Sequence, residues 1–203
     1  MLYSIRGNPY YVLSIYCLCI RNMGEILLLP AVQVENISKK YHTTYGEIAA
    51  LADISFNVSE GEFIGIVGPS GCGKSTLLSI IAGLLKPSKG KISVFGEPLE
   101  GVSPRVGYML QRDSLFEWRT IYKNVILGLE IQNRVTADDI NHVEALLKKY
   151  DLYMFKNHYP SQLSGGMRQR AALIRTLAVK PDILLLDEAF SALDYQTRAE
   201  NAS

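Results

Sequence analysis

The sequence predicts an α/β fold with a mostly parallel sheet. Two fully apolar runs, Phe63–Val67 and Ile183–Leu186, are typical of strands that are buried on both faces of such a sheet. Four segments with helical periodicity accompany them: Lys74–Ala82, Thr120–Gln132, Ala137–Tyr150 and Gly165–Val179. Strands and helices that alternate along the chain place the core in the α/β class.

A small antiparallel layer is predicted ahead of this core. Val32–Val34 and Ile54–Val58 alternate between apolar and polar residues, and the polar stretch His42–Gly46 lies between them as a turn. Two further short strands are expected at Lys91–Phe95 and Val106–Leu110.

The length of 203 residues suits one domain with a sizeable core. The first thirty residues do not match the rest, because Tyr10–Ile20 is an apolar, aromatic-rich run of eleven residues, too short to span a bilayer. We therefore expect residues 1–30 to be an N-terminal extension outside the domain, with Met23 as an alternative start, and residues 31–203 to form the domain. An anchor on a membrane surface is the other interpretation of the extension.

Charge and cysteine content narrow the function classes. The 21 Lys and Arg residues against 20 Asp and Glu residues leave the net charge near zero, and the sequence has no long basic run, which argues against nucleic acid as a partner. The three cysteines, Cys17, Cys19 and Cys72, suggest neither a disulfide framework nor a zinc site, so a reducing cytoplasm fits best.

A glycine-rich turn follows the first apolar strand and matches the phosphate-loop pattern G-x-x-x-x-G-K-[ST] in full. Glycines let the backbone N–H groups turn toward phosphate oxygens, and the helix N-terminus adds positive potential. Lys74 is expected to reach the β and γ phosphates of ATP, and Ser75 to bind Mg²⁺ through its hydroxyl. The alternative is a plain glycine turn before a buried helix. The predicted nucleotide-binding residues are Gly68, Pro69, Ser70, Gly71, Cys72, Gly73, Lys74, Ser75 and Thr76.

Two acids end the second apolar strand. Asp187 is expected to hold the water shell of magnesium, and Glu188 to act as the general base that deprotonates the attacking water. A solvated strand end is the alternative, but the phosphate loop favours the catalytic interpretation. The two motifs together predict a P-loop NTPase core.

A third motif indicates a family. Leu163-Ser164-Gly165-Gly166-Met167-Arg168-Gln169-Arg170 resembles the LSGGQ signature of ABC ATPases. Ser164 also suits a helix N-cap. The resemblance implies that Ser164, Gly165 and Gly166, on a helical subdomain, hold the γ-phosphate of a nucleotide bound to a second subunit, in a head-to-tail dimer.

Smaller features agree with the resemblance, which runs from about Val32 to about Thr197. Tyr41, about 27 residues before Gly68, lies where the family places an aromatic ring on adenine. Gln111 corresponds to the Q-loop glutamine, which touches magnesium and the catalytic water, and Asp194 to the D-loop. The implied partners are transmembrane permease subunits and, indirectly, a substrate-binding protein, with the chain peripheral on the cytoplasmic face of the membrane.

Within ABC ATPases the chain looks similar to importers of nitrate, sulfonate or taurine, so a small anion is the expected substrate class. The transported substrate itself is not predicted, because its specificity lies in other subunits. The apolar residues near Gln111 have two equal interpretations, either as a docking surface for a permease or as part of the hydrophobic core. They are Trp118, Tyr122, Leu127 and Leu129. The resemblance to the importer group rests on Phe190–Arg198 and on Gln111–Val125, including Leu115, Phe116, Trp118, Arg119 and Asn124.

The chain departs from the family pattern at its C-terminus. The family's switch histidine follows the catalytic glutamate, whereas His42, His142 and His158 all precede it. The resemblance implies that a strand between the two apolar strands is also missing, which would leave two unpaired strand edges. We therefore expect weak or absent ATP hydrolysis. A truncated nucleotide-binding fragment is one alternative. A DNA-maintenance ATPase is the other, but such chains insert long coiled coils between the phosphate loop and the signature, where this chain has only about ninety residues without heptads.

Overall fold

The computed structural model describes residues 2–4, 16–19, 30–44 and 46–187. These residues form two compact units, each described by itself. The first runs from the N-terminus to Tyr108 and includes residues 182–187, and the second contains residues 109–181.

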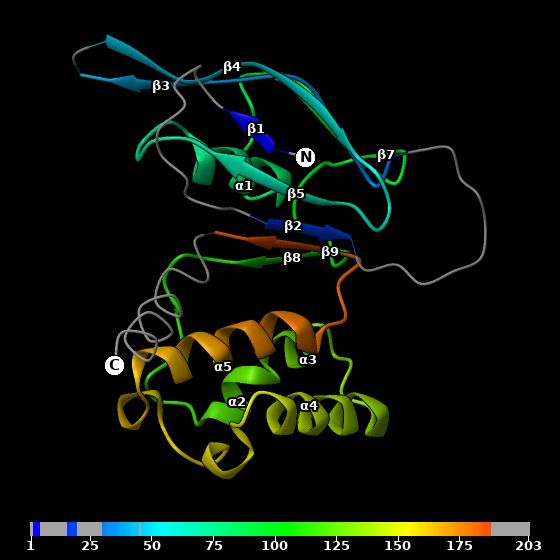
Figure 1. Ribbon diagram of the computed structural model, residues 1–203, viewed down its shortest axis with the longest axis vertical. Coiled ribbons are helices and arrows are strands. Elements are labelled where there is room, and N and C mark those ends of the chain that lie inside the picture. The colour runs from blue at the N-terminus through cyan, green and yellow to red at the C-terminus, as the bar shows by residue number, and fades with distance from the viewer. Residues whose placement is uncertain (1, 5–15, 20–29, 45, 188–203) are drawn as a thin grey trace, which may run out of the picture. The chain divides into compact units, whose positions relative to one another are not determined.

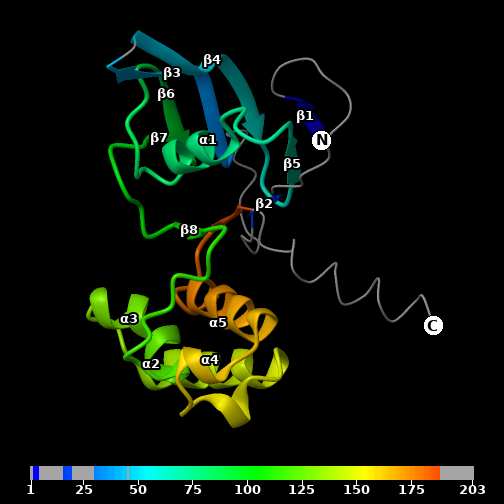
Figure 2. The ribbon, with the colours of Figure 1, turned by 90° about the vertical axis from the view of Figure 1, so that its left-hand side faces the viewer.

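A four-stranded antiparallel sheet forms one layer of the first unit. Its order is β4 (Gly46–Val58), β3 (Val32–Thr43), β6 (Lys89–Val94) and β7 (Glu97–Pro98). The predicted antiparallel layer is thus present, with longer strands than expected. Helix α1 (Lys74–Ile81) lies against it, and Leu77, Leu78, Ile80 and Ile81 join the core that the two share (Figure 2).

The second sheet of this unit has five strands. Their order is β1 (Leu2–Ser4), β5 (Phe63–Val67), β2 (Tyr16–Cys19), β9 (Ile183–Leu186) and β8 (Val106–Met109). All four residues of β9 are buried, as the apolar run predicts.

The place of β2 corrects three expectations. It runs antiparallel to both β5 and β9 and lies between them, where Figure 1 shows it as a blue arrow beside the orange β9. Two segments of the N-terminal extension, β1 and β2, therefore pair with the sheet rather than standing outside the domain. The facing edges of β5 and β9 are paired rather than open. The sheet is also mixed rather than mostly parallel. The strands β5 and β9 share a direction, but β2 lies between them and runs opposite to both.

The second unit is helical. Its helices are α2 (Ile121–Val125), α3 (Leu127–Ile131), α4 (Ala137–Lys149) and α5 (Gly165–Ala178), with short 3₁₀ turns at Tyr153–Phe155 and Pro160–Gln162. α5 packs on α2, α3 and α4 (Figure 1). The buried side chains at its centre are Ile121, Val125, Leu129, Val143, Leu147, Leu152, Ala171, Ala172, Ile174 and Ala178.

Local chemistry explains where α4 begins and how closely α3 approaches α5. Thr136 and Asp139 form a capping box at the start of α4. The single helix predicted over Thr120–Gln132 is instead two short helices that meet at Ile126. At Gly128 a Cβ would lie 2.7 Å from a methyl of Val179, so this glycine permits the close approach of α3 to the end of α5.

Candidate nucleotide-binding site

The glycine-rich loop joins β5 to α1, as the sequence predicts. Gly71 (φ 75°) and Gly73 (φ 102°) both have left-handed backbones, which side chains with a Cβ rarely adopt. At Gly73 a Cβ would also lie 2.6 Å from the carbonyl oxygen of Ala50. α1 has no side-chain cap, so the N–H groups of its first turn remain available for an anion.

Lys74 is buried inside this loop, with 5% of its surface exposed. Its Nζ donates hydrogen bonds to the carbonyl oxygens of Gly68 and Pro69, each at 2.9 Å. Within the part of the chain that the structure describes, no carboxylate forms an ion pair with it. A buried ammonium without a counter-charge is costly, so the loop is suited to accept a negatively charged group.

The buried carboxylate of Asp187 belongs to the residue directly after β9 in the same unit. Its Oδ2 accepts a hydrogen bond from the hydroxyl of Tyr108 at 3.3 Å, whereas Oδ1 is buried and has no partner among the described residues. Burial, and then the neighbouring Asp187, raise the pKa of Tyr108 to about 12 against the opposing effect of a hydrogen bond with Ser79. Tyr108 therefore remains a donor at neutral pH.

An unpartnered buried carboxylate oxygen suits a hydrated divalent cation. Ser75, the other metal-binding residue predicted in this unit, is exposed in the first turn of α1. The residues present thus fit magnesium.

Tyr41 presents an exposed ring on β3. It pairs with Ile48 across the β3–β4 hairpin, 40% of its surface is exposed, and the ammonium of Lys39 lies 5.5 Å from the ring centroid. An exposed ring of this kind is available for stacking on a base. Two predicted residues, Glu188 and Asp194, lie outside the described residues.

The remaining predicted residues belong to the helical unit. Ser164 is the N-cap of α5 and accepts a hydrogen bond from the N–H of Met167 at 3.3 Å. Gly165 follows it at the helix start and lines a hollow together with Gln111 and Gln169. The structure therefore brings the predicted Q-loop residue next to the predicted signature.

Two arginines of α5, whose partners the sequence analysis missed, hold the segment after Gln111. Arg168 donates to Asp113, from Nε to Oδ2 at 2.9 Å and from a terminal nitrogen to Oδ1 at 3.3 Å. Arg175 donates to the backbone oxygens of Ser114 and Asp113, each at 2.7 Å. Burial raises the pKa of Asp113, but Arg168 and the N–H of Leu115 outweigh it, and the net direction is downward. The sequence signal that could have indicated these contacts was the number of arginines in the signature helix.

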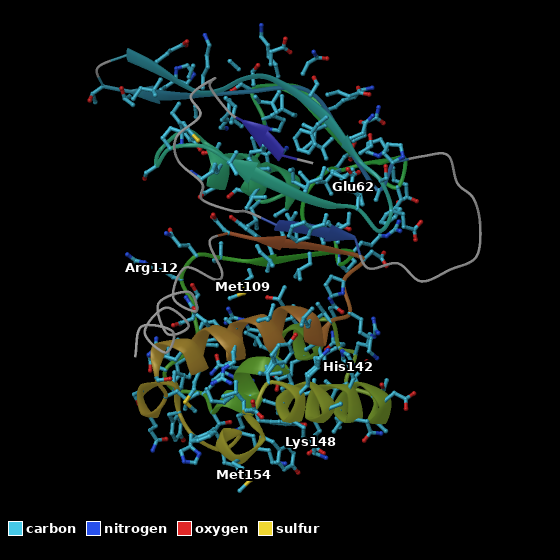
Figure 3. All side chains as sticks on the ribbon, viewed as in Figure 1. Glu62, Met109, Arg112, His142, Lys148 and Met154 are labelled. Carbon is cyan, nitrogen blue, oxygen red and sulfur yellow. The ribbon has the colours of Figure 1, made fainter. Side chains whose placement is uncertain are left out.

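The apolar residues near Gln111 divide between surface and core. Trp118 is 74% exposed and its ring lies 4.9 Å from that of Phe116, whereas Leu129 is fully buried. Met154, 81% exposed, also points away from the helices of this unit (Figure 3). Trp118 is therefore a surface residue and Leu129 a core residue.

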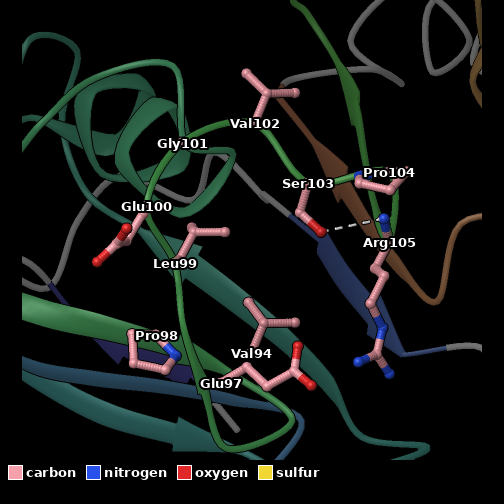
Figure 4. Close-up of a pocket in the computed structure, with 10 residues that line it drawn as sticks. All are labelled: Val94, Glu97, Pro98, Leu99, Glu100, Gly101, Val102, Ser103, Pro104 and Arg105. Atoms are coloured by element: carbon pink, nitrogen blue, oxygen red, sulfur yellow. Dashed lines mark hydrogen bonds between the residues drawn. The ribbon is translucent and has the colours of Figure 1, made fainter.

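A separate hollow of the first unit contains no predicted site residue. Val94 and the segment Glu97–Arg105 line it, and the backbone N–H of Arg105 donates to the hydroxyl of Ser103 inside it (Figure 4). It is therefore not the predicted nucleotide site.

Comparison with known proteins decides the family. The family model described as ABC transporter matches residues 51–191, more than half of the chain. This chain belongs to the ABC transporter family. The matched range contains the phosphate loop, Asp187 and the signature segment.

Relatives of this ABC transporter chain include ATP-binding proteins of importers. The uncharacterized ABC transporter ATP-binding protein YtlC of Bacillus subtilis is 47% identical over 167 residues, which cover 82% of this chain and 64% of YtlC. The sulfate/thiosulfate import protein CysA of Synechocystis is 44% identical over 173 residues, 84% of this chain and 48% of CysA. The methionine import ATP-binding protein MetN of Bordetella pertussis is 42% identical over 174 residues, 82% of this chain and 48% of MetN. The chain thus spans between about half and two thirds of these relatives.

A solved structure supports the ABC cassette fold. The ATP-binding cassette MJ0796, a dimer in a post-hydrolysis state with ADP and Pi, superposes with a TM-score of 0.67 at 34% identity. The match covers 74% of this chain and 70% of that one. In the described parts of the ABC chain, no helix is both long and apolar enough for a membrane span.

Proposed function

We propose that the chain binds ATP with Mg²⁺ and hydrolyses it, at the weak rate expected from the sequence, as one subunit of a head-to-tail dimer that energises an ABC importer. The observation that carries the proposal is Lys74, a buried ammonium inside a loop with free helix N–H groups and without a carboxylate partner in the described residues. A triphosphate supplies the negative charge that this loop accepts.

The residues of the first unit have distinct roles in this proposal. The loop N–H groups and Lys74 hold the β and γ phosphates, Ser75 binds the metal, and Tyr41 stacks on adenine. Asp187 holds a metal-bound water through its free oxygen, Oδ1. When bound, Mg²⁺ neutralises charge on the phosphates during transfer.

Glu188 and Gln111 act on the attacking water. Glu188 takes a proton from this water as general base, and Gln111 contributes to orienting the water and the metal. Both roles are assigned by position in the motifs.

The second copy contributes the start of its α5. Ser164, Gly165 and Gly166 present N–H groups at a helix N-terminus, which suits the γ-phosphate of the opposite subunit. The dimeric state of MJ0796 with ADP and Pi supports this arrangement by similarity. Asp194 couples the two sites across the dimer.

The exposed Trp118 and Phe116 pair is proposed as the docking surface for a permease on the cytoplasmic face of the membrane. Through the permease the chain would act with a substrate-binding protein. A small anion such as nitrate, sulfonate or taurine is the proposed substrate class, and the relative named for sulfate/thiosulfate supports an anion. Methionine is the competing class, because of the relatives named for it.

The first experiment measures ATP binding and turnover by the purified chain and by two variants. Lys74→Ala should abolish both, whereas Lys89→Ala, at an exposed position of β6, should change neither. Binding that is equal in the wild type and Lys74→Ala would refute the proposal. Lys74-dependent binding without turnover would instead support the alternative, a nucleotide-binding fragment with impaired catalysis.

A further inference from the structure

Tyr108 connects the two motifs of the proposed magnesium site. Its hydroxyl donates to Oδ2 of Asp187 at 3.3 Å, and the side chain of Ser79 acts on the same phenol by opposing the rise in its pKa. Ser79 lies on α1, one helical turn after Ser75. The phenol therefore pairs with the acid that follows β9, and its ring packs on the core to which the helix after the phosphate loop belongs.

The ring of Tyr108 is fixed by its surroundings. It is half-buried and packs against the hydrophobic core that α1 and β9 share, on a strand that neighbours β9. Because the ring cannot swing away without leaving this core, the hydroxyl is held in place. The hydroxyl is the only polar group of the side chain, so Phe would keep the packing and remove only the hydrogen bond to Asp187.

Asp187 is left with its two oxygens in different environments. Oδ2 has the phenol as donor, whereas Oδ1 is buried without a partner in the described residues, and the residue is only 4% exposed. A carboxylate with one occupied oxygen cannot rotate freely, so the other oxygen keeps a single direction. This is the arrangement that holds a metal-bound water most effectively.

We propose that Tyr108 is a positioning residue for the magnesium site, which occupies Oδ2 of Asp187 and so directs Oδ1 toward the hydrated metal. This inference rests on the proposed ATP and Mg²⁺ binding. In this proposal Tyr108 acts only through its hydrogen bond to Asp187. Outer-shell partners of this kind are worth about 10- to 100-fold in metal affinity or activity, and we expect the lower end because the contact to Mg²⁺ runs through water.

The test measures affinity for a fluorescent ATP analogue in EDTA and in Mg²⁺ for the wild type and Tyr108→Phe. We expect equal affinity in EDTA and about tenfold less tightening by Mg²⁺ in the variant. Tyr150→Phe, a half-buried tyrosine of the helical unit, is the matched control and should behave as wild type. Asp187→Asn should lose the magnesium effect most strongly.

Two outcomes would overturn the inference. An unchanged magnesium effect in Tyr108→Phe would show that Asp187 needs no positioning by the phenol. An equal loss of affinity in EDTA and Mg²⁺ would make Tyr108 a packing residue of the pocket. Both differ from failure of the proposed function, in which the wild type itself shows no Lys74-dependent binding and the inference falls with it.

Discussion

Arg168 and Asp113 form a two-point ion pair between α5 and the segment that follows Gln111, with nitrogen–oxygen distances of 2.9 and 3.3 Å. Glu117 adds a third acceptor for Arg168 at 3.0 Å. Both partners are largely shielded from solvent, since 28% of the Arg168 side chain and 20% of the Asp113 side chain are exposed. The pair therefore links the predicted signature helix to the predicted Q-loop inside one unit.

We predict that Arg168→Lys lowers the free energy of unfolding by about 1 kcal/mol. The compact ammonium of lysine replaces the planar guanidinium, which can donate two hydrogen bonds to one carboxylate. Urea denaturation followed by circular dichroism measures the change. Glu47→Gln, which breaks the exposed pair with Lys40 on the β3–β4 hairpin, serves as the control and should leave stability unchanged. Equal effects of the two substitutions would contradict the prediction.

Acid should destabilise the helical unit through Asp139. Hydrogen bonds from the Thr136 side chain and then from Lys180 lower the pKa of Asp139 from its ordinary value near 4 to about 2, although burial opposes them. A carboxylate whose folded-state pKa is depressed contributes stability above its unfolded pKa and loses it as pH falls toward the folded value. The contribution should therefore disappear between about pH 5 and pH 2.

Thermal melts of the wild type and Asp139→Asn between pH 6 and pH 2 measure this loss. We expect the variant to be less stable at pH 6 and the two curves to converge at low pH. Asp113, whose pKa is also lowered, titrates in the same direction, so some pH dependence should persist in the variant. Parallel curves at all pH values would contradict the assignment to Asp139.

Proline at Leu18 should disrupt the five-stranded sheet. Leu18 pairs with Phe63 of β5 on one side and with Leu184 of β9 on the other. Proline removes a backbone donor, and with it a ladder hydrogen bond, from an inner strand, so we expect a clear fall in the free energy of unfolding. Leu18→Thr keeps the N–H group and should be much less harmful in the same urea titration. If both variants unfold alike, β2 does not stabilise the sheet through its backbone.

Alanine at two glycines should separate stability from function. Gly73→Ala should reduce both stability and ATP binding, because Gly73 has a φ of 102° and its Cβ would meet the oxygen of Ala50. At Gly165 an added Cβ would have no atom within 4 Å, so Gly165→Ala should retain full stability. Turnover by the dimer should fall, because the new methyl group would crowd the γ-phosphate of the opposite subunit. Denaturation and ATPase assays on both variants test this contrast, which would be contradicted if Gly165→Ala also unfolded early.

Trp118→Ala should weaken assembly with a permease and leave nucleotide affinity intact, because the side chain is 74% exposed and contacts Phe116 at the surface. Co-purification with a permease and ATP binding are measured side by side. Leu129→Ala, at a fully buried position, is the comparison and should lower the free energy of unfolding by about 2–5 kcal/mol. Equal loss of assembly and of nucleotide binding in Trp118→Ala would contradict a role of this side chain specific to docking.

The sequence by itself determined the features that depend on neighbours along the chain. The spacing of Gly73, Lys74 and Ser75 specified the loop, and the residues around Ser164 specified the start of α5, because left-handed glycines and helix caps act within a few residues. The buried strand β9 was equally evident, because a continuous apolar run is stable only where both faces are covered.

Only the tertiary structure decided which distant groups meet. The pairing of β2 with β5 and β9 could not be predicted, because the ladder joins backbone groups that any short apolar segment presents. The bonds from Tyr108 to Asp187 and from Arg168 to Asp113 span 79 and 55 residues. Each depends on the place of its strand or helix in the packed core, for which local sequence carries no periodic signal.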